Sequence, residues 1–163
     1  MLQAFGVWLK TTKLSWFVVT YPWVWPTCET LHFIGLAMLI GTVWILDLRM
    51  LGVAKGLPIA PMHRLLRWGV AGFMINLVTG FLFFVGTPYQ YIGNIGFYLK
   101  MLCVVLAGVN VLVFYLTVYD RVENLEPDED APLPAKVIAA ASLLLWLGVM
   151  SFGRLLPYFG NSF

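Results

Sequence analysis

The fold is decided by residues 27–51, which read TCETLHFIGLAMLIGTVWILDLRML. No Asp, Glu, Lys or Arg occurs between Glu29 and Asp47. About 20 largely apolar residues are enough for a helix to cross roughly 30 Å of hydrocarbon. The stretch therefore predicts a transmembrane helix with charged residues near both of its ends.

Apolar stretches of similar length follow at 61–86, 92–119 and 135–158. Short polar or proline-containing segments separate them and stop one helix before the next begins. Of the 163 residues, 61% are hydrophobic and only 11% are charged, against about 25% charged in soluble domains. We therefore expect an all-α integral membrane bundle in which residues 21–163 form four spans.

Residues 1–20 differ from these spans because Lys10 and Lys13 interrupt their apolar pattern. Leu2, Phe5 and Leu9 fall on one helical face, which is typical of an amphipathic helix lying in the membrane interface. A mobile leader is the alternative. We expect an interfacial helix before the bundle.

The orientation of the bundle follows from its positive charges. One side carries Lys and Arg near the span ends, at Arg49, Lys55, Arg64, Arg67, Arg121 and Lys136. The other side has only Lys10 and Lys13 outside the spans. Because Lys and Arg are enriched in cytoplasmic loops, both termini are predicted on the periplasmic side of a bacterial inner membrane. The net charge of +2 gives no case for nucleic acid, so lipids are the expected neighbours.

Four ionisable residues lie inside the predicted spans on the side of the termini: Glu29, His32, Lys100 and Arg154. The helical rise of about 1.5 Å per residue places them within roughly 12 Å of one another in depth. Such groups usually face the bundle interior or a water-filled cavity. Two interpretations remain open, a ligand or cofactor site, and structural ion pairing or snorkelling of Lys100 and Arg154 to the headgroups.

A redox cofactor is the leading hypothesis for this site. With haem b, His32 would be an axial ligand, Lys100 and Arg154 would pair with the propionates, and Glu29 would orient the imidazole. With a quinone, His32 would donate to a carbonyl oxygen and Glu29 would relay protons. The other histidine, His63, begins the second span on the opposite side, on the order of 25 Å away. One chain therefore cannot supply two histidine ligands to one haem.

Copper is a weaker alternative. Cys28, His32 and Met101 would give it soft sulfur and imidazole ligands. Buried cysteines and methionines usually serve packing instead. The other polar residues of the spans have structural explanations. Asn76 and Asn110 are expected to form interhelical hydrogen bonds, and Asp47 and Arg49 are expected to form a surface pair.

Other functional classes remain as alternatives. A proton-coupled transporter or channel would use Glu29 and His32 as a titrating gate. The cytoplasmic half of the bundle has few polar groups beyond Asn110 and Asp47, which argues against a path for ions or protons across the membrane. The sequence contains no phosphate-binding loop, zinc-protease motif or nucleophile elbow, so it does not favour a stand-alone enzyme. A structural subunit, within a homo-oligomer or a larger membrane complex, is the third possibility.

Ordered motifs along nearly the whole chain resemble an uncharacterised family of four-span bacterial inner-membrane proteins. They are Pro22-Trp23-Val24-Trp25-Pro26, Glu29-x-x-His32-Phe33, Leu46-Asp47-Leu48-Arg49, Phe97-x-x-Lys100, Ala107-Gly108-x-Asn110 and Gly153-Arg154. The resemblance implies the architecture and supplies no activity. More distantly, the first span is similar to copper-resistance membrane proteins of the CopD type and to four-helix b-type cytochromes. The third and fourth spans lack the histidines of those cytochromes.

Overall fold

The computed structural model describes residues 2–159, apart from the side chains of Leu2, Ala60 and His63. Throughout this part of the chain the regular structure is helical. Four helices are long and apolar enough to cross a membrane: α3 (Val24–Met50), α5 (Leu66–Gly86), α6 (Ile95–Thr117) and α8 (Leu133–Phe159). The prediction of an all-α bundle with four spans is confirmed.

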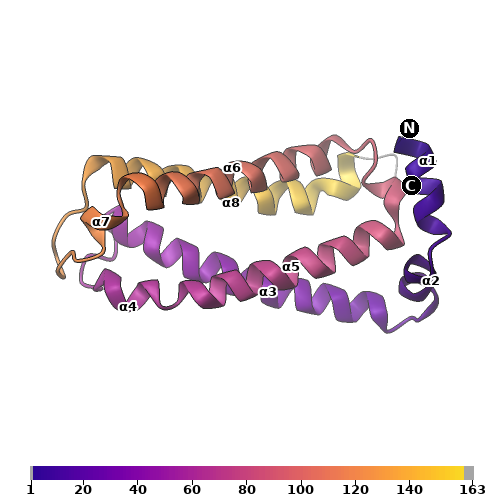
Figure 1. Ribbon diagram of the computed structural model, residues 1–163, viewed down its shortest axis with the longest axis horizontal. Helices are drawn as coiled ribbons and strands as arrows, with labels where there is room; N and C mark the ends of the chain where they lie inside the picture. Colours follow the sequence, from indigo (N-terminus) through magenta and orange to yellow (C-terminus); the bar gives the residue numbers. More distant parts are fainter. Residues whose placement is uncertain (1, 160–163) are drawn as a thin grey trace.

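The long helices form two antiparallel hairpins, α3 with α5 and α6 with α8 (Figure 1). The hairpins meet mainly where α3 packs against α8. At one end of the bundle, called here the terminal end, lie α1 (Leu2–Lys10), α2 (Lys13–Thr20) and the short helix η1 (Pro88–Gln90). At the other, the loop end, lie α4 (Ile59–His63), α7 (Tyr119–Val122) and the segment that leads into α8.

Glycines allow the two helices of each hairpin to approach closely. A Cβ atom at Gly35 of α3 would lie 2.8 Å from the carbonyl oxygen of Gly72 on α5. In the other hairpin, a Cβ atom at Gly148 of α8 would lie 2.9 Å from Sγ of Cys103 on α6. Small residues at helix crossings of this kind are typical of membrane bundles. The crossing at Gly35 matters for the site, because it holds the adjacent turns of α3 and α5 together.

The bundle has three buried apolar clusters. The middle cluster joins the hairpins, the cluster at the loop end packs α3 and α8 against α4 and α7, and the cluster at the terminal end packs α2 against α3. Most other large apolar side chains of the long helices are exposed. Exposed apolar surface on helices with internally satisfied backbones is what a lipid environment requires.

The N-terminal segment differs from the single helix predicted over residues 1–20. It forms two short helices, α1 and α2, which lie across the terminal end of the bundle (Figure 1). Thr12 causes the break, since its backbone is extended and its Oγ1 accepts a 3.2 Å hydrogen bond from the Ser15 amide. This is the arrangement of a helix N-cap, so α2 starts anew after Thr12.

The second span also differs from its prediction. The expected helix 61–86 is interrupted at Arg64 and Leu65, where the amides bond to carbonyls three residues earlier. These bonds form a turn between α4 and α5, and the continuous span begins only at Leu66.

Candidate functional site

The centre of the predicted site is His32, which is half-buried on α3 near the terminal end. Its Nδ1 lies 2.7 Å from Oγ1 of Thr79 on α5. The same Oγ1 lies 2.7 Å from the carbonyl oxygen of Ile75. A hydroxyl has one proton, and two oxygens at this distance need a proton between them. Thr79 therefore donates to Ile75 and accepts from His32.

This hydrogen-bond chain fixes the tautomer of the imidazole. Nδ1 of His32 carries the proton, which leaves a lone pair on Nε2. Within the described residues, Nε2 has no hydrogen-bond partner. The ring centroid of Phe83 lies 5.6 Å from that of His32, and Trp25 lies 4.9 Å from Phe83. His32 is thus a hydrogen-bond acceptor whose orientation is fixed, and the aromatic rings of Phe83 and Trp25 lie beside it.

Glu29 lies one turn before His32 and does not orient it. Its Oε1 accepts a 3.1 Å hydrogen bond from Nε1 of Trp25, and its side chain is exposed. Burial raises the pKa of the nearby Tyr91, the Thr87 hydrogen bond opposes that shift, and the Glu29 carboxylate adds to it. Thr79 takes the orienting role that was expected of Glu29, so that detail of the haem hypothesis is wrong.

The two basic residues of the predicted site occupy different environments. Lys100 of α6 is half-buried, and its Nζ lies 3.6 Å from the position of a Cβ atom at Gly153 on α8, so the glycine makes room for it. Lys100 lies close enough to His32 for their charges to interact. Arg154 is exposed. Across the part of the chain that the structure describes, neither residue forms an ion pair with Glu29.

Of the four predicted residues, Glu29 and His32 thus lie one turn apart on α3, Lys100 is half-buried on α6, and Arg154 is at the surface. The proposed copper ligands are more scattered. Cys28 is buried one turn from His32 in the cluster with α2, whereas Met101 is exposed on α6. Among the described residues, no group of three or more His, Cys, Asp or Glu side chains could hold a metal ion. The side chain of His63 lies outside the described residues.

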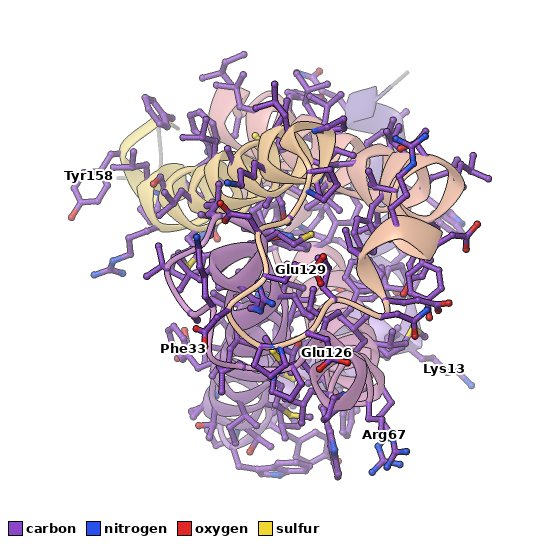
Figure 2. The ribbon with its side chains drawn as sticks, turned by 90° about the vertical axis from the view of Figure 1, so that its left-hand side faces the viewer. Lys13, Phe33, Arg67, Glu126, Glu129 and Tyr158 are labelled. Atoms are coloured by element: carbon purple, nitrogen blue, oxygen red, sulfur yellow. The ribbon has the colours of Figure 1, made fainter. Side chains whose placement is uncertain are left out.

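The prediction of a surface pair at Asp47 and Arg49 is wrong. Arg49 is fully buried and donates to three carbonyl oxygens, those of Leu57 at 2.6 Å, Glu126 at 2.9 Å and Glu129 at 3.1 Å. It thereby ties two loops over the loop end. In the end-on view of Figure 2, Glu126 and Glu129 lie across the middle of this end.

Asp47 is also buried and faces the Ser142 hydroxyl of α8. Residues two apart on a helix point to different sides, which separates Asp47 from Arg49. That spacing was the signal in the sequence that could have argued against a pair.

The two intramembrane asparagines behave differently. Asn110 of α6 donates to the Ile138 carbonyl oxygen of α8 at 3.1 Å, as predicted for an interhelical bond. Asn76 instead donates to Gly72 on its own helix at 2.9 Å. Its Oδ1 is buried and has no partner among the described residues. Asn76 lies one turn from Thr79, so this acceptor adds to the polar groups near His32.

This fold, with polar groups buried among apolar helices, defines a multi-pass helical membrane protein. A family model described as a family of unknown function (DUF6644) matches residues 5–159, and the chain belongs to that family. No curated protein and no solved structure matches the chain. The predicted membership in a family of unknown function is confirmed, and the distant resemblance to copper-resistance proteins and cytochromes gains no support.

Proposed function

We propose that the protein binds a small redox-active ligand through His32, in the half of the membrane nearer the terminal end. The observation that carries the proposal is the hydrogen bond between His32 and Thr79, which leaves the Nε2 lone pair open. Histidines that ligate metals likewise donate their other ring N–H to an outer partner, usually a carboxylate, a backbone carbonyl or water. The lone pair also suits the hydroxyl of a quinol. The ligand is therefore a haem or a quinol.

The surroundings of His32 suit either ligand. Phe83 and Trp25 offer aromatic rings beside which a flat ligand can stack. Lys100 supplies a positive charge for a haem propionate or for a quinone oxygen. For a quinone-type ligand the direction of the hydrogen bond changes from the expected one, because Nε2 accepts from the ligand and cannot donate to it.

The test is the ligand content of the purified protein. Absorption spectra of the oxidised and reduced protein report haem, and solvent extraction with chromatography reports quinones. We expect one of these in the wild type and in His63→Ala, and at least about a tenfold loss in His32→Ala, since a ligand bond is removed. Equal ligand in His32→Ala and His63→Ala, or neither ligand in the wild type, would refute the proposal.

A proton-coupled transporter or channel is the second candidate, favoured by Asp47 and Ser142 in the half nearer the loop end. Asp47 was expected in this half of the bundle, and it is buried and faces a second buried polar group, Ser142. Proton flux into dye-loaded proteoliposomes distinguishes this function. It requires flux that is lost in both His32→Ala and Asp47→Asn, whereas a ligand-binding protein shows none.

A further inference from the structure

A second polar site lies between α3 and α8, away from His32. It consists of Asp47 and Trp44 on α3 and of Ser142 and Trp146 on α8. Asp47 is 15 residues from His32, which corresponds to about 22 Å along a helix. Asp47 and Ser142 are each only 4% exposed, and Trp146 is 6% exposed. The ligand proposed at His32 does not use these four residues.

The four side chains form two layers. Trp44 precedes Asp47 by one turn, and Trp146 follows Ser142 by one turn. Because α3 and α8 run in opposite directions (Figure 1), the positions of Trp44 and Trp146 are both one turn nearer the terminal end than those of Asp47 and Ser142. Trp44 packs against the same apolar cluster that contains Trp146. Asp47 and Ser142 thus form one layer between α3 and α8, and the two tryptophans form the next layer toward the terminal end.

Three polar atoms of this site have no hydrogen-bond partner among the described residues: Oδ2 of Asp47, Nε1 of Trp44 and Nε1 of Trp146. Buried polar atoms almost always have a hydrogen-bond partner, so three atoms without one on the facing helices α3 and α8 need an explanation. Two are donors and one is an acceptor. A metal cation needs several oxygen ligands and is repelled by N–H donors. Water satisfies both kinds of atom, because it donates and accepts.

No cation neutralises Asp47 within the described part of the chain. Arg49, the nearest on its own helix, is engaged by the loop carbonyls. From α8 the facing polar group is the neutral Ser142. The other charged groups at this end have partners or are exposed. Lys55 and Lys136 pair with Asp130, and the half-buried Glu123 accepts a hydrogen bond from Asn124. The remaining ones are exposed: Arg64, Arg67, Asp120, Arg121, Glu126, Asp128 and Glu129.

We propose that Asp47 and Ser142 form a proton-binding site, hydrated by water held between the indole N–H groups and the carboxyl group. The proton binds to a carboxylate oxygen of Asp47, and Ser142 hydrogen bonds to that carboxyl group. Intramembrane carboxyl groups of this kind mark proton relays in other membrane proteins. The site is independent of the proposed ligand at His32 and would function with or without it.

Infrared difference spectroscopy of the protein in lipid bilayers tests this site. We expect a carboxylic acid C=O band that is lost reversibly as the pH is raised. The band should be absent in Asp47→Asn and unchanged in the control Asp120→Asn, which removes an exposed carboxylate. A wild-type protein without the band, or a band that survives Asp47→Asn, overturns the proposal.

Three further measurements test the site even if Asp47→Asn does not fold. Ser142→Ala removes the facing hydroxyl, so the band should shift in frequency, and an unshifted band contradicts the site. Transfer to D₂O should shift the band promptly if water reaches Asp47, and a band that stays unshifted excludes a hydrated site. Loss of the band on adding NaCl at constant pH, with none on adding choline chloride, would show that a metal cation competes and would overturn the assignment to protons alone.

Discussion

Each end of the bundle has an arginine near the C-terminal end of a long helix, Arg49 at the loop end and Arg154 at the terminal end. The two side chains lie in opposite environments. Arg49 at the loop end is fully buried, and three of its nitrogens donate to backbone carbonyls. Arg154 at the terminal end is exposed and has no ion pair among the described residues. At the loop end, the buried charge of Arg49 fixes the loops in place. At the terminal end, His32 retains hydrogen-bonding capacity, which is what a ligand site needs.

The largest effect is expected from Arg49→Ala. The change leaves three loop carbonyls without their donor, and an unsatisfied buried carbonyl costs about 1–3 kcal/mol. Leu57, Glu126 and Glu129 are exposed, so water can replace part of the lost hydrogen bonds. We therefore expect a total loss of roughly 3–5 kcal/mol, in the lower part of the summed range. Thermal unfolding in detergent, followed by circular dichroism, measures it. Arg154→Ala is the matched control and should change stability by less than about 0.5 kcal/mol. Similar losses in both variants would remove the contrast between the two ends.

A smaller effect is expected at the crossing that holds His32 and Thr79 side by side. Gly35→Ala places a methyl group 2.8 Å from the Gly72 carbonyl oxygen, so α3 and α5 must shift apart. Overpacking of this kind costs about 1–3 kcal/mol. Gly41→Ala is the control, because nothing lies within 4 Å of its Cβ position. If both alanines are tolerated alike in unfolding experiments, the close crossing is not important for stability.

Thr79→Val tests the hydrogen bond that orients His32 near the terminal end. It keeps the shape of the side chain and removes the hydroxyl that accepts from His32, at a cost of about 1 kcal/mol. Ligand retention should fall several-fold, since the imidazole is no longer fixed. Thr30→Val is the control, because among the described residues its hydroxyl bonds only to the Pro26 carbonyl oxygen on its own helix. Full ligand retention in Thr79→Val would show that the hydrogen bond does not serve the site.

The smallest effect is expected at the exposed Asp130, which bridges Lys55 at 2.7 Å and Lys136 at 3.3 Å. Hydrogen bonds from Lys55 and then Lys136 hold the pKa of Asp130 below its usual range. A carboxyl group of this kind contributes stability above its unfolded pKa of about 4 and loses it as the pH falls through the lower, folded value. Asp130→Asn should therefore lower the melting temperature slightly at neutral pH, and the difference from wild type should vanish in acid.

The sequence predicts the four spans well because hydropathy is a local property. The expected span 27–51 corresponds to α3, and the expected span 92–119 contains α6. The breaks in the N-terminal helix and in the second span were not predicted, because each depends on only one or two residues. A single capping threonine, Thr12, separates α1 from α2, and one turn at Arg64 and Leu65 separates α4 from α5.

The site was predicted less completely, because helical rise gives depth and leaves the direction of a side chain open. Glu29, His32 and Arg154 fall at similar depth, yet only the first two share a neighbourhood, since Arg154 is exposed. Thr79 was not predicted, because a threonine in an apolar span is usually bonded to its own helix. Arg49 was misplaced because loops fold over the helix end, and Asp47 was misplaced because α8 packs against it.

The most direct test of the central claim, that His32 offers an open Nε2 to a ligand, is ¹⁵N NMR of histidine-labelled protein in lipid. The His63→Ala background leaves His32 as the single histidine. We predict a neutral ring with the proton on Nδ1, an unprotonated Nε2 whose resonance moves when haem or a quinol is added, and loss of the fixed tautomer in Thr79→Val. A proton on Nε2, or a resonance that neither ligand moves, would contradict the account.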